Sequence, residues 1–103
     1  MSTDHNITVT PIDARPTICY GAPDGIDVAF SYTLDGTTYT GGCTLFPCED
    51  GRPGYEESGP LDYWLDGDTC ARLRAGEETR EMARAIVEAC APVAAAYAAE
   101  AAS

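Results

Sequence analysis

The chain has 103 residues, of which 45% are apolar, and its seventeen acidic residues against six arginines give a net charge of −11. This length predicts one domain over residues 1–103, and the apolar fraction argues against wholesale disorder. The strong acidity argues against direct binding to nucleic acid or to anionic membranes, and no apolar run reaches the roughly 18 residues of a membrane span. Because residues 1–6 lack the basic and apolar regions of a secretory signal, we expect a cytoplasmic protein.

The first elements are predicted to be short strands. Residues 1–6 are polar, and we expect them to be flexible. Residues 7–12 alternate in polarity and predict a strand, which Pro11 restricts to a sheet edge because proline has no amide hydrogen for a ladder. Residues 13–16 are predicted to connect this strand to a second one at residues 17–20. Residues 21–25 contain glycine and proline in a pattern typical of turns.

The strongest local signal is a hairpin over residues 26–45. Two alternating runs flank Asp35-Gly36, a dipeptide typical of the two-residue type I′ turn. A turn at this position places Leu34 opposite Thr37 and, at the far end, Ile26 opposite Leu45. One face of the hairpin is then apolar and requires a cover, whereas the other face is small and polar.

The next twenty residues are predicted to be less regular. Residues 46–60 contain six glycines and prolines, and we expect a long irregular loop, which in a compact domain is often functional. Residues 61–65 are apolar and aromatic and predict a returning strand, followed by a hairpin turn at Asp66-Gly67. Residues 69–75 fit either a short strand or a helix that begins after Thr69.

A C-terminal helix is predicted over residues 77–101. Its apolar side chains recur at helical spacing, and Pro92 is expected to kink the helix without ending it, because the stripe continues in phase. The stripe consists of Met82, Ile86, Cys90, Val93 and Tyr97. This is the stripe that can cover the hairpin, so we predict an α+β fold in which an antiparallel sheet of four to five strands has this helix on one face.

The sequence contains few candidates for catalysis or metal binding. His5 is the single histidine and lies in the polar N-terminus, away from any fixed partner. Cys43 and Cys48 could form a disulfide or, with other cysteines, bind zinc, but in the expected reducing compartment buried thiols are favoured. The segment from Asp62 to Asp68 departs from the calcium-loop pattern and favours a turn. We therefore predict a protein that is not an enzyme and has no metal or cofactor.

The most suggestive segment is acidic and aromatic and extends from residue 49 to residue 68. Such a surface fits the recognition of a larger protein with a basic surface, because aromatic side chains supply contact area and carboxylates attract cations. The candidate partner-binding residues are Glu49, Asp50, Tyr55, Glu56, Glu57, Asp62, Trp64, Asp66 and Asp68. The alternative is that Tyr63 and Trp64 belong to the core and that the acidic residues only solvate a loop.

In size, charge and layout the chain resembles phage-encoded inhibitors of host defence, including anti-CRISPR proteins and nucleic-acid mimics. The resemblance implies an inhibitor that occupies a basic or nucleic-acid-binding surface of a larger partner, but no diagnostic motif is matched, so it assigns no residue a role. The alternative function is that of a structural domain that forms a homodimer through its alanine-rich C-terminal helix.

Overall fold

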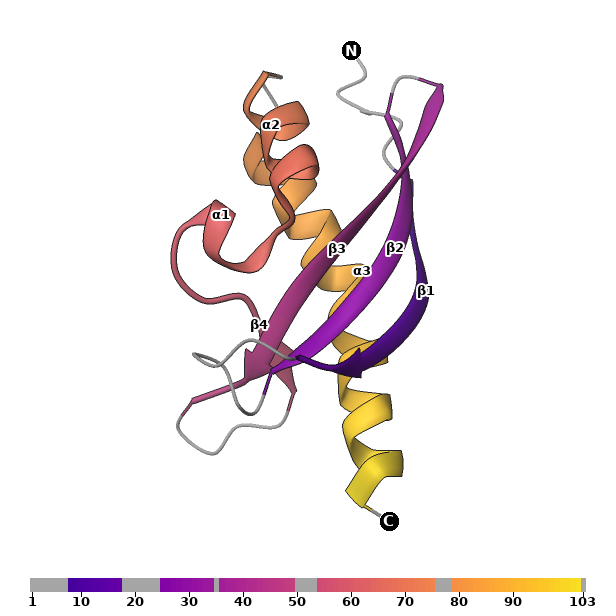
Figure 1. The fold of residues 1–103 in the computed structure, drawn as a ribbon, viewed down its shortest axis with the longest axis vertical. Helices are drawn as coiled ribbons and strands as arrows, with labels where there is room; N and C mark the ends of the chain where they lie inside the picture. The colour runs from indigo at the N-terminus through magenta and orange to yellow at the C-terminus, as the bar shows by residue number, and fades with distance from the viewer. Residues whose placement is uncertain (1–7, 18–24, 35, 50–53, 76–78, 103) are drawn as a thin grey trace.

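The computed structural model describes residues 8–17, 25–34, 36–49, 54–75 and 79–102. These residues form an antiparallel sheet of four strands in the order β1-β2-β3-β4, and the long helix α3 crosses one face of it (Figure 1). This confirms the predicted α+β class. The elements are β1 (Thr8–Pro16), β2 (Ile26–Leu34), β3 (Thr37–Pro47), β4 (Tyr55–Glu56), α1 (Leu61–Trp64), α2 (Gly67–Ala75) and α3 (Thr79–Ala102).

The register of the β2–β3 hairpin is confirmed at every predicted pair. Leu34 lies opposite Thr37, and the pairing continues without a shift to Ile26 opposite Leu45. Gly36 has φ = 84°, the left-handed conformation that the turn requires and that glycine adopts without a steric penalty. The tight turn therefore fixes which side chains of both strands share the covered face.

The core lies between this face of the sheet and the helices. From the sheet, α2 and α3 it takes the fully buried side chains of Val28, Phe30, Tyr32, Leu45, Leu73, Ile86 and Cys90. Val93 and Tyr97 complete the predicted stripe as half-buried residues. The helix α3 continues through Pro92. Proline has no amide hydrogen to donate to the Glu88 carbonyl, and both residues lie on the exposed side of the helix.

The first strand is longer than predicted. We expected it to end at residue 12 and residues 13–16 to be a connector, but β1 continues to Pro16. A register shift between Pro11 and Asp13 leaves Ile12 unpaired and 62% exposed, and this bulge restores the in–out alternation for the residues that follow. The edge position predicted from Pro11 is confirmed, since β1 is the outermost strand on this side. The predicted flexible residues 1–6 and most of the predicted strand at 17–20 lie outside the described residues.

The prediction for residues 46–65 is wrong in two places. The expected loop over residues 46–60 contains two stretches of strand. Its first two residues, Phe46 and Pro47, belong to β3, and Tyr55–Glu56 pair with them as β4. The expected strand at 61–65 is instead the short helix α1, and only Leu65 bridges to the sheet, opposite Cys43. Pro60 precedes the helix with extended geometry, and an N-terminal proline suits the first turn of a helix. The ambiguous residues 69–75 are helical and belong to α2.

The helix α3 is long and apolar enough over Arg80–Ala101 to cross a membrane, judged by length and composition. The core helix of a soluble protein meets the same criteria. Here the side chains of Met82, Ile86, Cys90 and Ala94 are buried in the core. About 22% of the apolar stretch is buried, so these contacts account for part of its apolar composition, which consists mostly of alanine.

Candidate functional site

The predicted partner-binding residues that the structure describes lie in different environments. Four of them are exposed on the segment that leads from the end of β3 to the start of α2: Glu49, Glu57, Asp62 and Asp68. Tyr55 and Glu56 are half-buried and form β4, and Asp50 lies outside the described residues. The segment follows the β3 side of the sheet (Figure 1).

Asp66 is a structural residue in this fold. Its Oδ1 accepts a hydrogen bond from the Gly42 amide at 3.0 Å, and its own amide donates to the Gly42 carbonyl at 2.9 Å. Its Oδ2 accepts from the Thr69 amide at 3.2 Å, which is the side-chain cap expected at the start of a helix. Asp66 therefore joins α2 to the edge of β3. The hairpin turn predicted at Asp66-Gly67 is a helix start.

The two adjacent aromatic residues of α1 have opposite environments. Trp64 is 4% exposed and lies in the core. It is therefore not available to a partner on the surface, contrary to the prediction. Tyr63 is 53% exposed, and its ring stacks on Phe46 with centroids 5.8 Å apart and an interplanar angle of 22°. Tyr63 was not among the predicted residues, since alternation along a strand does not say which of two neighbours faces outward. The helical geometry of α1 places Trp64 in the core and Tyr63 at the surface.

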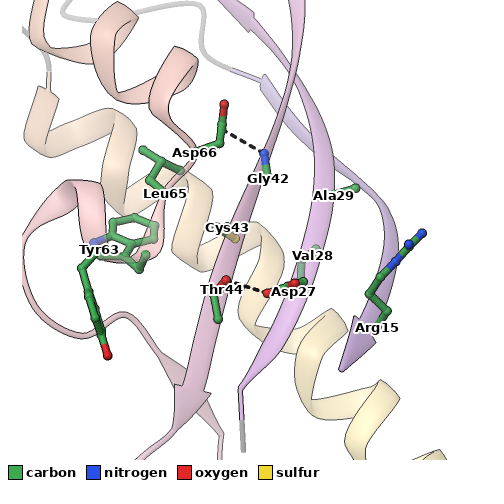
Figure 2. Close-up of a pocket in the computed structure, with 11 residues that line it drawn as sticks. Arg15, Asp27, Val28, Ala29, Gly42, Cys43, Thr44, Tyr63, Leu65 and Asp66 are labelled. Atoms are coloured by element: carbon green, nitrogen blue, oxygen red, sulfur yellow. Dashed lines mark hydrogen bonds between the residues drawn. The ribbon is translucent and has the colours of Figure 1, made fainter. Parts of the chain in front are cut away.

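A groove of about 330 Å³ lies on the uncovered face of the sheet beside α1 (Figure 2). Its floor is formed by small residues of the paired strands, among them Ala29, Gly42 and Thr44. Tyr63 and Asp66 line its α1 side, and Arg15 of β1 lines the opposite side. The short side chains of the central strands thus leave a shallow space between an aromatic wall and the edge strand.

Asp27 is a second carboxylate that lines this groove and is held by a hydrogen bond. The Thr44 hydroxyl donates a hydrogen bond to Asp27 Oδ1 at 2.6 Å, across the hairpin. Arg15 lies opposite Asp27 in the strand register, but its guanidinium donates to Asp13 Oδ2 at 3.0 Å, and Figure 2 shows the side chain directed away from Asp27. The hydrogen bond from Arg15 lowers the pKa of Asp13 from its ordinary value. Asp27 was not among the residues predicted from the sequence, which places it in a strand far from the acidic segment.

The most enclosed arginine is held by the core. The guanidinium carbon of Arg72 lies 4.2 Å from the centroid of the Tyr39 ring, and its Nη1 donates to the Tyr32 hydroxyl at 3.0 Å. Tyr32 in turn contacts Thr69 Oγ1 at 3.4 Å. This charge is directed inward onto aromatic rings. The hydrogen bond with Tyr32 and, to a smaller extent, the charge of Asp68 raise the pKa of Arg72, so this arginine also lies near a carboxylate of the acidic segment.

The cysteines form no reactive arrangement among the described residues. Cys43 and Cys90 are buried free thiols in contact with each other, so the considered Cys43–Cys48 disulfide is not formed. The hydrogen bond with Cys90, followed by burial, raises the pKa of Cys43 from its ordinary value. In the described part of the chain, no three histidine, cysteine, aspartate or glutamate side chains lie close enough to hold a metal ion. A protonated, buried thiol packs as a small apolar side chain.

Comparison with protein-family models, with curated proteins and with solved structures finds no match for this chain.

Proposed function

We propose that this chain is a non-catalytic acidic module that binds a larger protein by occupying a basic or nucleic-acid-binding surface. The observation that carries the proposal is the concentration of acidic residues in one part of the sequence. From Gly25 to Asp68 the sequence carries nine carboxylates and a single arginine, Arg52, and seven of these carboxylates belong to the described residues. They are Asp27, Glu49, Glu56, Glu57, Asp62, Asp66 and Asp68.

The described arginines lie outside this stretch of the sequence, although Arg80 and Arg84 line a pocket together with Glu57 and the charge of Asp68 acts on Arg72. Arg72, Arg74, Arg80 and Arg84 belong to α2 and the first turns of α3, and Arg15 is paired within β1. A surface of one sign of charge attracts the opposite sign and speeds the encounter at low salt. The acidic segment, residues 49–68, is thus suited to a partner that normally binds phosphates.

Two features favour a binding surface over a solvated loop. The exposed Tyr63 ring is fixed by its stacking on Phe46, and aromatic side chains with little freedom are typical anchors of protein interfaces. The carboxylates lie on a backbone that β4, the Leu65 bridge and the Asp66 hydrogen bonds attach to β3. A surface that is already ordered loses less entropy when it binds.

The test is affinity capture from a lysate of the source cell with two variants of equal charge change. The variant Glu49→Lys/Asp62→Lys reverses two exposed carboxylates of the acidic segment. The control Glu88→Lys/Glu100→Lys reverses two exposed carboxylates of α3. We expect the wild type and the control to capture the same basic protein, in competition with nucleic acid, and the first variant to lose it. Equal capture by both variants would place the interface elsewhere.

A second candidate function is self-association through α3. Between Ala89 and Ala99 the helix carries no charged residue, and its C-terminal turns extend past the sheet (Figure 1). Half-buried Val93 and Tyr97 lie in this part. In a molecule of charge −11 this is a surface on which two copies could approach with little repulsion. Light scattering after size exclusion tests it: a monomeric mass at all concentrations excludes the dimer.

A further inference from the structure

We propose that the groove beside α1 receives an arginine side chain of the partner, with the guanidinium on the Asp27 carboxylate and beside the Tyr63 ring. This inference rests on the proposed function and specifies how its surface recognises a cation. It depends on the groove, a held carboxylate and a fixed aromatic ring, and not on the number of acidic residues nearby.

The Asp27 carboxylate is held in place by one hydrogen bond and can accept more. The 2.6 Å hydrogen bond from Thr44 fixes Oδ1, and a carboxylate accepts about four hydrogen bonds in all. Asp66, the other carboxylate that lines the groove, is occupied by the amides of Gly42 and Thr69. Among the described residues that line the groove, Arg15 is the cation, and it is hydrogen-bonded to Asp13. A half-buried carboxylate is therefore left for a cation from outside.

The shape of the groove favours a planar cation. Ala29 and Gly42, which line its floor, have a methyl group and no side chain respectively, so they leave room above the sheet. The Tyr63 ring on one side is held by Phe46 and remains 53% exposed. A guanidinium is planar, stacks on aromatic rings and binds a carboxylate through two parallel hydrogen bonds, whereas an ammonium acts as a compact charge. These properties select arginine over lysine.

The experiment titrates the isotope-labelled protein with three capped tripeptides, acetyl-Gly-X-Gly-amide, where X is arginine, lysine or citrulline. Backbone amide shifts report the site. We expect saturable shifts at Asp27, Gly42, Thr44 and Tyr63 with the arginine peptide, weaker binding of the lysine peptide and none of the neutral citrulline peptide. Asp27→Asn should weaken arginine binding about tenfold or more, the effect of one hydrogen bond to a charged group. The control Asp68→Asn makes the same charge change outside the groove and should leave binding unchanged.

Tyr63→Leu provides a second, independent variant, because this side chain is largely exposed and its loss does not require Asp27 to change. It should remove the preference for arginine over lysine. Equal binding of the arginine and citrulline peptides, or equal effects of Asp27→Asn and Asp68→Asn, would overturn the inference. If the peptide fails to bind while partner capture still depends on Glu49 and Asp62, this inference is wrong and the proposed function stands. If capture is independent of those residues as well, both are wrong.

Discussion

The start of α2 lies close against the sheet at Gly41, and this contact yields the sharpest prediction about the fold. A methyl group added at Gly41 would collide with Thr69 Oγ1 and would lie 3.0 Å from Asp66 Oδ1 and 3.2 Å from Phe30 Cζ. Thr69 is fully buried and Asp66 caps the same helix, so neither can move without shifting the start of α2. We therefore expect Gly41→Ala to push α2 away from β3.

The expected cost follows from these contacts. Forcing an extra methyl group into a packed core costs about 1–3 kcal/mol. Weakening the Asp66–Gly42 hydrogen bond adds about 1 kcal/mol. Gly41→Ala should thus lower the free energy of unfolding by roughly 2–4 kcal/mol, and each kcal/mol lowers the melting temperature of a domain this size by about 4–8 °C.

The neighbouring glycine supplies the control. A methyl group at Gly42 would meet nothing closer than the Val28 carbonyl oxygen at 3.8 Å, an ordinary contact on the uncovered face. Gly42→Ala should be neutral or stabilise by about 0.4–1 kcal/mol, because alanine restricts the unfolded chain. Urea unfolding followed by the fluorescence of Trp64, the single and buried tryptophan, measures both variants. Equal stabilities for the two alanine variants would refute the described packing of α2 on β3.

Three further predictions concern the cap, the proline inside α3 and the buried thiols. Asp66→Ala should lower the free energy of unfolding by about 2 kcal/mol through loss of the cap, whereas Asp68→Ala on the exposed side should cost less than about 0.5 kcal/mol; equal costs would argue against the cap. Pro92→Ala should raise the free energy of unfolding by about 1–3 kcal/mol, since an exposed proline inside a continuous helix lacks a hydrogen bond; a loss of stability in thermal unfolding would contradict this. Because the folded state raises the pKa of Cys43 above its ordinary value of 9.0, stability should be complete below about pH 9 and fall as pH rises further. Cys43→Val should reduce that fall, and an unchanged pH profile would argue against the buried thiol pair.

The parts of the fold that the sequence predicts are those in which one local rule decides the outcome. The Asp35-Gly36 turn sets the whole β2–β3 register, and the helical spacing of Met82, Ile86 and Cys90 identifies the face of α3 that packs on the sheet. No long-range contact competes with either pattern. Both predictions therefore hold residue by residue.

The predictions are wrong where contacts between residues far apart in the sequence determine the local structure. Residues 61–65 have the composition of a strand, but β4 and the Leu65 bridge occupy positions along β3, and α1 fits between them. The bulge at Ile12 extends β1 past a proline that ends a regular strand in isolation. The sequence predicts a turn at Asp66, because its hydrogen bonds to Gly42 join residues far apart in the chain and leave no local pattern.

The same limit applies to the candidate site. The acidic segment is visible in the sequence because its residues are consecutive. The groove is not visible there, because Asp27, Thr44 and Tyr63 come from three separate elements. What the sequence does contain is the hairpin register, which places Asp27 opposite Thr44 on the uncovered face.

The most direct test of an acidic surface that binds a basic partner is the salt dependence of the affinity for the captured protein. Titration of the purified partner at several salt concentrations gives the slope of the logarithm of Kd against the logarithm of salt. We predict a steep increase of Kd with salt for the wild type, and a shallower one for Glu49→Lys/Asp62→Lys, because screening weakens contacts between exposed charges. An affinity that does not change with salt would contradict recognition through these carboxylates.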